Sequence, residues 1–184
     1  LKRLSFRYIK RLSDTSLPSQ NIDDGIKSVF FATSSRQEFL NSEVKSDFYV
    51  SWTKFYLDNF SDQIWLLINN DSVVGYLMGC SSSLDALEWF RSRVKSYSLF
   101  SDLFEKFPAH FHINLLAEAR GHRFGEKLVD SYLQQLCSLN LGGVHIVTSE
   151  DARNQHFYRR LGFYETVVRE FNGQSLLFMG KSLT

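Results

Sequence analysis

The most constraining feature of this sequence is an unbroken order of strand, charged glycine loop and helix over residues 109–136. Residues 109–116 alternate His110, His112 and Asn114 with apolar side chains, which predicts a strand with three polar groups on one face. A charged loop, residues 120–125, follows, and apolar residues recur after it at helical spacing. This order of elements predicts an α/β fold.

The loop from Arg120 to Gly125 has the chemistry of a phosphate site. A loop that opens a helix exposes unpaired backbone N–H groups at the positive end of the helix dipole. Glycines let an anion approach the backbone, and Arg120, His122 and Arg123 add cationic donors. From this loop alone, a helix start with solvated arginines has equal weight. The glycine patterns of the Rossmann fold and of the P-loop are absent.

The rest of the chain predicts strands and helices around this unit. Two hairpins are expected, because Asn69-Asn70-Asp71 and Asn172-Gly173 suit tight turns. Strands are predicted over 4–9, 63–68, 72–80, 144–148, 163–169 and 175–181. Helices are predicted from a cap at Asp23 or Asp24, over 42–60 with an aromatic stripe (Phe48, Trp52, Phe55, Tyr56), within 84–107, and over 154–161.

Composition restricts the class of protein. The 184 residues suffice for one domain, and 21 basic against 20 acidic side chains provide no long-range field for nucleic acid or anionic lipid. Apolar runs are far shorter than the ~20 residues of a membrane helix, and no leading hydrophobic segment is visible, so a cytoplasmic protein is expected. Cys80 and Cys137 are expected to be buried thiols.

Two motifs together resemble the GNAT superfamily of acyl-CoA-dependent N-acetyltransferases. Arg120 and Gly125 match the family's cofactor loop, Arg/Gln-x-x-Gly-x-Gly/Ala, but Arg123 stands at the middle glycine. The family's later motif is matched by Asn154, Phe157, Tyr158, Leu161, Gly162 and Phe163. Residues 110–116 are also similar to a strand of a GNAT branch that includes the acetyltransferase-like region of O-GlcNAc hydrolases.

The resemblance implies a single GNAT-like domain over residues 1–184. Its α/β (α+β) fold would have a mixed, mostly antiparallel sheet of about seven strands flanked by helices. Splayed central strands would form the acyl-CoA cleft. Residues 84–107 would be a helical insertion near the substrate side, and their aromatic side chains would help to line the acceptor pocket.

The resemblance also implies acetyl-CoA as co-substrate. Free backbone groups of the strand end would pair with the pantetheine arm, and the loop would hold the pyrophosphate. The expected cofactor-binding residues are Leu115, Leu116, Ala117, Arg120, Gly121, His122, Arg123, Phe124, Gly125, Glu126, Asn154, Phe157 and Tyr158. If position 123 needs a glycine-like backbone angle, phosphate binding is weakened; if it is ordinary helix, Arg123 adds a charge beside the pyrophosphate.

Three residues are expected to be catalytic. The resemblance implies that the Tyr158 hydroxyl protonates the departing thiolate and that a backbone N–H near Leu115 stabilises the oxyanion. His112 is the first candidate for the base that accepts the proton of the amine, and Glu118 is another. The remaining candidates for the base are Asn114, His145 and Glu150. No metal site is expected, because no Cys or carboxylate stands at ligand spacing beside His110-x-His112.

These inferences predict an N-acetyltransferase that transfers acetyl from CoA to a primary amine of a small molecule or peptide, by direct attack in a ternary complex. The alternative is a catalytically inactive GNAT-like module for ligand binding or protein interaction, which Arg123 favours. Neither nucleic acid nor membrane is an expected partner. A homodimer is one expectation, with the final hairpin as its exchange surface.

Overall fold

A computed structural model describes residues 7–183 of the chain. The strands are β1 (Arg7–Arg11), β2 (Ile64–Asn69), β3 (Ser72–Cys80), β4 (Ala109–Leu115), β5 (Gly143–Ser149), β6 (Glu165–Phe171) and β7 (Gln174–Ser182). The α-helices are α1 (Ser19–Thr33), α2 (Ser42–Asn59), α3 (Ser83–Arg93), α4 (Phe124–Ser138) and α5 (Gln155–Arg160). Short 3-10 helices include η3 (Tyr97–Leu103) and η4 (Ala117–Ala119).

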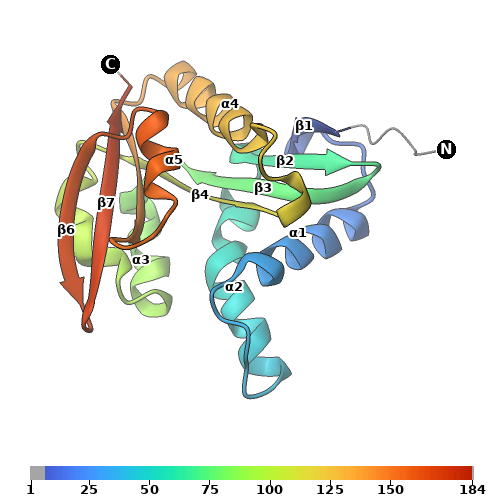
Figure 1. The fold of residues 1–184 in the computed structure, drawn as a ribbon, viewed down its shortest axis with the longest axis horizontal. Helices are drawn as coiled ribbons and strands as arrows, with labels where there is room; N and C mark the ends of the chain where they lie inside the picture. The colour runs from blue at the N-terminus through green and yellow to red at the C-terminus, as the bar shows by residue number, and fades with distance from the viewer. Residues whose placement is uncertain (1–6, 184) are drawn as a thin grey trace. The chain divides into compact units, whose positions relative to one another are not determined.

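Seven strands form one sheet in the order β1-β2-β3-β4-β5-β7-β6. The pairs β1–β2, β2–β3, β5–β7 and β6–β7 are antiparallel. β4 and β5 are parallel, with Ala109 paired to Val144 and His110 to His145. The predicted mixed, mostly antiparallel sheet of seven strands flanked by helices is therefore confirmed (Figure 1).

Both predicted hairpin turns form, because their residues tolerate a left-handed backbone. Asn70 and Asp71 join β2 to β3 with φ of 46° and 64°. Asn172 and Gly173 join β6 to β7 with φ of 50° and 76°. Positive φ at both central residues matches the right-handed twist of the paired strands, so these turns fix the register of each hairpin.

The chain divides into two compact units, one made of the chain up to Gly79 with His112–Tyr132, the other of Cys80–Phe111 with Leu133–Thr184. In the first unit, α1 and α2 lie on one side of β2 and β3, and the start of α4 lies on the other side (Figure 1). Gly79 of β3 makes room there for the Tyr132 ring of α4, since a Cβ at this position would overlap the ring. The apolar face of α4 is buried, as its helical spacing predicts.

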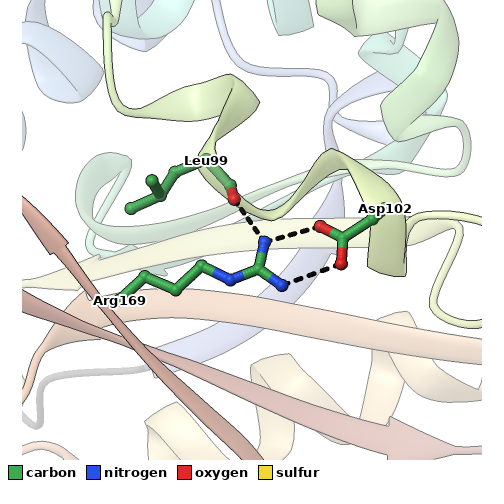
Figure 2. A network of polar contacts seen from close by, with 3 residues as sticks. All are labelled: Leu99, Asp102 and Arg169. Atoms are coloured by element: carbon green, nitrogen blue, oxygen red, sulfur yellow. Dashed lines mark hydrogen bonds and ion pairs between the residues drawn. The ribbon is translucent and has the colours of Figure 1, made fainter.

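In the second unit, α3 and η3 form the segment predicted as an insertion. Phe100, Phe104 and Phe107 are buried against Phe178 of β7. Arg169 of β6 holds the segment in place: its guanidinium donates to the Leu99 carbonyl at 2.5 Å and to the Asp102 carboxylate at 2.6 and 2.8 Å (Figure 2). These three rings fill a core, so the expectation that they line an acceptor pocket is corrected; Trp89 and Tyr97 of the same segment are half-buried.

Several local predictions were wrong. Asp23 and Asp24 lie inside α1, which begins at Ser19 after Pro18, because proline has a φ suited to a helix start. Trp52 of the aromatic stripe is 37% exposed, and Cys137, which was expected to be buried, is exposed on α4. Residues 84–107 are α3 and η3 rather than continuous helix. Residues 4–6 of the predicted first strand lie outside the described part of the chain.

Candidate functional site

The loop between β4 and α4 is held by two local hydrogen bonds in the first unit. Arg120 Nε donates to the Leu115 carbonyl at 3.0 Å, which folds the loop back onto the strand end. His122 Nδ1 donates to the Arg120 carbonyl at 2.7 Å. Gly121 has φ of 76°, a conformation that glycine adopts without strain. The loop is therefore an exposed turn that local hydrogen bonds hold in place.

The turn leaves a row of backbone donors without protein acceptors. In the described part of the chain, the N–H groups of residues 121–126 make no hydrogen bond to protein, whereas the Lys127 N–H donates to the Arg123 carbonyl. These donors open α4, where the helix dipole favours negative charge. The arrangement fits a phosphate or pyrophosphate group.

Arg123 has φ of 61° and so adopts the glycine-like backbone angle. A non-glycine residue in this left-handed region is strained. Its side chain is nevertheless 80% exposed and pairs with Glu126, with 2.7 Å from Nε to Oε2. Arg123 thus strains the turn but extends outward, and the carboxylate beside it raises the pKa of the guanidinium.

The backbone N–H groups at the end of β4 point to alternate edges of the strand. The Leu116 N–H donates to the Val74 carbonyl of β3 at 2.9 Å, and the Leu116 carbonyl accepts from Ala119. Because N–H groups alternate between the two edges of a strand, the Leu115 N–H points to the other edge. Of the three residues expected to meet pantetheine, Leu116 therefore has both backbone groups engaged within the protein. Ala117 and Glu118 lie in η4, and Glu118 is exposed.

His112 of β4 is enclosed by aromatic rings in the same unit. Its ring centroid lies 5.1 Å from that of Tyr56 on α2 and 5.6 Å from that of Tyr76 on β3. Its Nε2 is buried without a hydrogen-bond partner in the described structure. Burial lowers the pKa of His112 to about 4, so the imidazole is neutral at physiological pH. An orphaned buried nitrogen is costly, and a bound ligand or water would satisfy it.

Asn114 follows on the same face of β4. Its Nδ2 donates to the Tyr76 hydroxyl at 2.8 Å. This bond fixes both side chains, and it occupies the amide that was an alternative candidate for the base. Sequence reasoning missed Tyr56 and Tyr76 as neighbours of the site, because aromatic residues in a helix stripe or a buried strand normally indicate core packing.

Tyr158 lies on α5 in the second unit and is buried. Its ring packs against Phe111, Phe157 and Phe163 at centroid distances of 6.2, 5.2 and 5.8 Å. Burial raises the pKa of the phenol, so the hydroxyl keeps its proton, the form that a proton donor needs. Asn154 precedes the helix, where its Oδ1 accepts from the Thr148 hydroxyl at 3.0 Å.

The other two histidines near β4 have structural partners in the second unit. His110 Nδ1 and the Ser83 hydroxyl are 2.7 Å apart. His145 Nδ1 donates to the Phe107 carbonyl at 2.8 Å, and its ring stacks on Phe104 and Phe178. Burial lowers the pKa of His145 to about 4. Residues 7–183 contain no group of three or more His, Cys, Asp or Glu placed to hold a metal ion.

A groove of about 410 Å³ lies between α1 and α2 in the first unit. Its walls carry both signs of charge, and Lys54 pairs with Asp58 inside it at 2.6 Å. The groove is lined by Gln20, Asp23, Asp24, Lys27, Tyr49, Val50, Thr53, Lys54, Leu57 and Asp58. No helix within the described residues is both long and apolar enough to cross a membrane.

Comparison with solved structures shows the same fold in known proteins. SsHAT aligns with a TM-score of 0.73 at 17% identity, covering 97% of this chain and 98% of the other. The NatC complex bound to Gag peptide and CoA aligns with a TM-score of 0.63 at 14% identity, covering 97% and 99%. A polyamine N-acetyltransferase of Drosophila melanogaster that forms N-acetylagmatine aligns with a TM-score of 0.64 at 9% identity, covering 96% and 100%.

Sequence comparison agrees with the fold. No curated protein sequence matches the chain. The family model for the acetyltransferase (GNAT) family matches residues 30–163, which is more than half of the chain. The matched range includes His112, Tyr158 and the turn at residues 120–125, which we call the phosphate-type turn. The chain therefore belongs to the acetyltransferase (GNAT) family.

Proposed function

We propose that this protein is an acetyl-CoA-dependent N-acetyltransferase that acts on a primary amine. The observation that carries the proposal is the row of unsatisfied N–H groups at residues 121–126. These donors suit the pyrophosphate of a nucleotide cofactor. The CoA present in the related NatC structure supports the same cofactor.

Acetyl-CoA, when bound, supplies an acetyl group activated as a thioester. The Leu115 N–H, on the edge of β4 that faces away from β3, is the proposed donor to the carbonyl oxygen. His112 Nε2 is the proposed acceptor for the proton that the amine loses as its nitrogen bonds to the carbonyl carbon. Tyr158 is the proposed donor to the sulfur as the carbon–sulfur bond breaks.

Glu118 and the later motif complete the proposed site. Glu118 is exposed in η4 and is a second acceptor for the amine proton. Asn154, which precedes α5, and Phe157, which lies within α5, are also proposed to contact the cofactor. The acceptor is a small molecule or a peptide. Agmatine and polyamines belong in the first panel of amines, since a protein of similar fold forms N-acetylagmatine.

Calorimetric titration with acetyl-CoA, followed by a thiol-release assay over a panel of amines, tests the proposal. Saturable binding in the micromolar range and loss of turnover in Tyr158→Phe are expected. Phe163→Leu, which alters a ring packed on Tyr158 without touching the hydroxyl, is the matched control and should keep most of the turnover. An unchanged rate in Tyr158→Phe would remove the phenol from the mechanism.

The second candidate function is a catalytically inactive GNAT-like module for ligand binding or protein interaction. The left-handed backbone at Arg123 is the observation that favours it, because a strained turn holds its N–H groups less firmly. This candidate predicts no heat with acetyl-CoA at high concentration. Calorimetry on the wild-type protein thus decides between the two.

A further inference from the structure

Two cations gather on the ring of Phe124, the first residue of α4. Arg7 of β1 places its guanidinium carbon 5.9 Å from the ring centroid. Lys127, one turn into α4, places its ammonium nitrogen 5.5 Å from the same centroid. The His122 ring lies 6.2 Å away. Residues more than a hundred positions apart in the sequence thus form one positive cluster beside the phosphate-type turn.

The charges of this cluster are not neutralised within the part of the chain that is described. Arg7 and Lys127 take part in no ion pair there, and Arg7 Nε is buried without an acceptor. The nearby carboxylates act on another residue, since Glu126 pairs with Arg123 and Asp130 raises the pKa of the same guanidinium. A buried N–H of a guanidinium without an acceptor is unfavourable, and an anionic ligand would satisfy it.

The cluster adds to the donors of the turn and does not duplicate them. The N–H groups of residues 121–126 suit one pyrophosphate, whereas Arg7 and Lys127 place their side-chain charges near the ring of Phe124. CoA carries, besides its pyrophosphate, a phosphate monoester on the ribose. A guanidinium and an ammonium together suit such a dianionic group.

We infer that Arg7 and Lys127, gathered on Phe124, form a binding site for the 3′-phosphate of CoA. This inference rests on the proposed function. It assigns cofactor recognition to a residue of β1, far in sequence from the cofactor loop. It also makes the protein selective for CoA over nucleotides that lack the monoester.

Calorimetry with CoA and with 3′-dephospho-CoA tests the site. Wild-type protein is expected to bind CoA about tenfold more tightly than the dephosphorylated form, an effect of one or two charge-assisted hydrogen bonds. Arg7→Met and Lys127→Met should each reduce this ratio, and the double variant should bring it close to one. Affinity for 3′-dephospho-CoA should stay unchanged in all three variants.

Arg11→Met is the matched control. Arg11 lies on the same strand, also has a buried Nε without an acceptor, and lies over Trp65 at 5.1 Å instead of Phe124. This variant should keep the wild-type ratio, and thermal melting should show that it and Arg7→Met are folded. Lys127→Met changes an exposed helix position, so its ratio of affinities for the two nucleotides can be measured even if Arg7→Met unfolds.

The outcomes separate this inference from the proposed function. Equal affinities of the wild-type protein for both nucleotides would overturn the inference and leave acetyl-CoA binding intact. The inference would also be overturned if the double variant Arg7→Met/Lys127→Met kept the wild-type ratio of affinities for CoA and 3′-dephospho-CoA. If neither nucleotide binds the wild-type protein, the proposed function fails and the inference fails with it.

Discussion

The two compact units differ in whether particular polar groups find hydrogen-bond partners within the protein. In the second unit, His145 donates to the Phe107 carbonyl, and Arg169 is bound by Asp102 and the Leu99 carbonyl. In the first unit, His112 Nε2 and the N–H groups of residues 121–126 have no protein partner in the described structure. Satisfied polar groups stabilise a fold, whereas orphaned ones cost stability unless a ligand completes them.

The comparison teaches where ligand chemistry is expected. The two histidines have the same direction of pKa shift from the same cause, because burial lowers both to about 4. Their pKa values alone therefore do not distinguish a catalytic base from a core residue. Their hydrogen bonds do, since only His112 has a nitrogen left over.

The largest effect is expected from Gly125→Glu in the first turn of α4. A carboxylate there meets the pyrophosphate in the row of open N–H groups, so acetyl-CoA affinity should fall by at least about 100-fold. Because a negative charge suits a helix start, thermal stability should be kept. Gly125→Ala is the control and should lose only a few-fold in affinity. Calorimetry and a thermal melt measure both quantities, and full binding by Gly125→Glu would place the phosphates elsewhere.

A matched pair of phenylalanine substitutions tests the two histidines. His112→Phe should lower kcat by about 100-fold, because the base is lost, while the protein melts at or above the wild-type temperature, because an orphaned nitrogen is removed. His145→Phe should keep turnover but cost about 1–3 kcal/mol of unfolding free energy, since the Phe107 carbonyl loses its donor. Rate assays and denaturant titrations measure both quantities. Loss of turnover in His145→Phe and loss of stability in His112→Phe would contradict the assignment of the two histidines.

Acid should destabilise the protein through both histidines. The folded imidazoles stay neutral down to about pH 4, whereas the unfolded state takes up protons below about pH 6.5. Their contribution to stability is therefore present above pH 6.5 and is lost progressively as the pH falls toward 4. Denaturant titrations across this range should show a shallower decline in the double variant His112→Phe/His145→Phe. An equal decline would assign the acid sensitivity to other groups.

The smallest effect concerns the strained turn. Arg123→Gly should raise the melting temperature by about 2–4 °C, because glycine adopts the observed φ of 61° without strain. Arg123→Ala keeps the Cβ that causes the strain and loses the pair with Glu126, so it should not raise the melting temperature. A rise in the alanine variant as well would mean that the side chain, not the backbone, is the source of the cost.

Much of this molecule follows from local sequence. Period-two alternation, helical spacing and the turn residues Asn70-Asp71 and Asn172-Gly173 predicted the hairpins and the strand–turn–helix order around residues 120–125, whereas the mixed sheet was implied by the resemblance to the family. These features depend on backbone preferences and on one apolar face, which neighbouring residues are enough to specify. The predicted start of α1 was wrong. Asp23 and Asp24 are residue types suited to a helix cap, but the helix already begins at Ser19, directly after Pro18.

The sequence by itself determined the family and the order of strand, turn and helix around residues 120–125, because these are contiguous motifs. Only the tertiary structure decided that Arg123 adopts a left-handed angle, that His112 but not His145 keeps an open nitrogen, and that Arg7 reaches Phe124. Hydrogen-bond satisfaction and cation placement depend on which distant segments meet, and no local spacing contains that information.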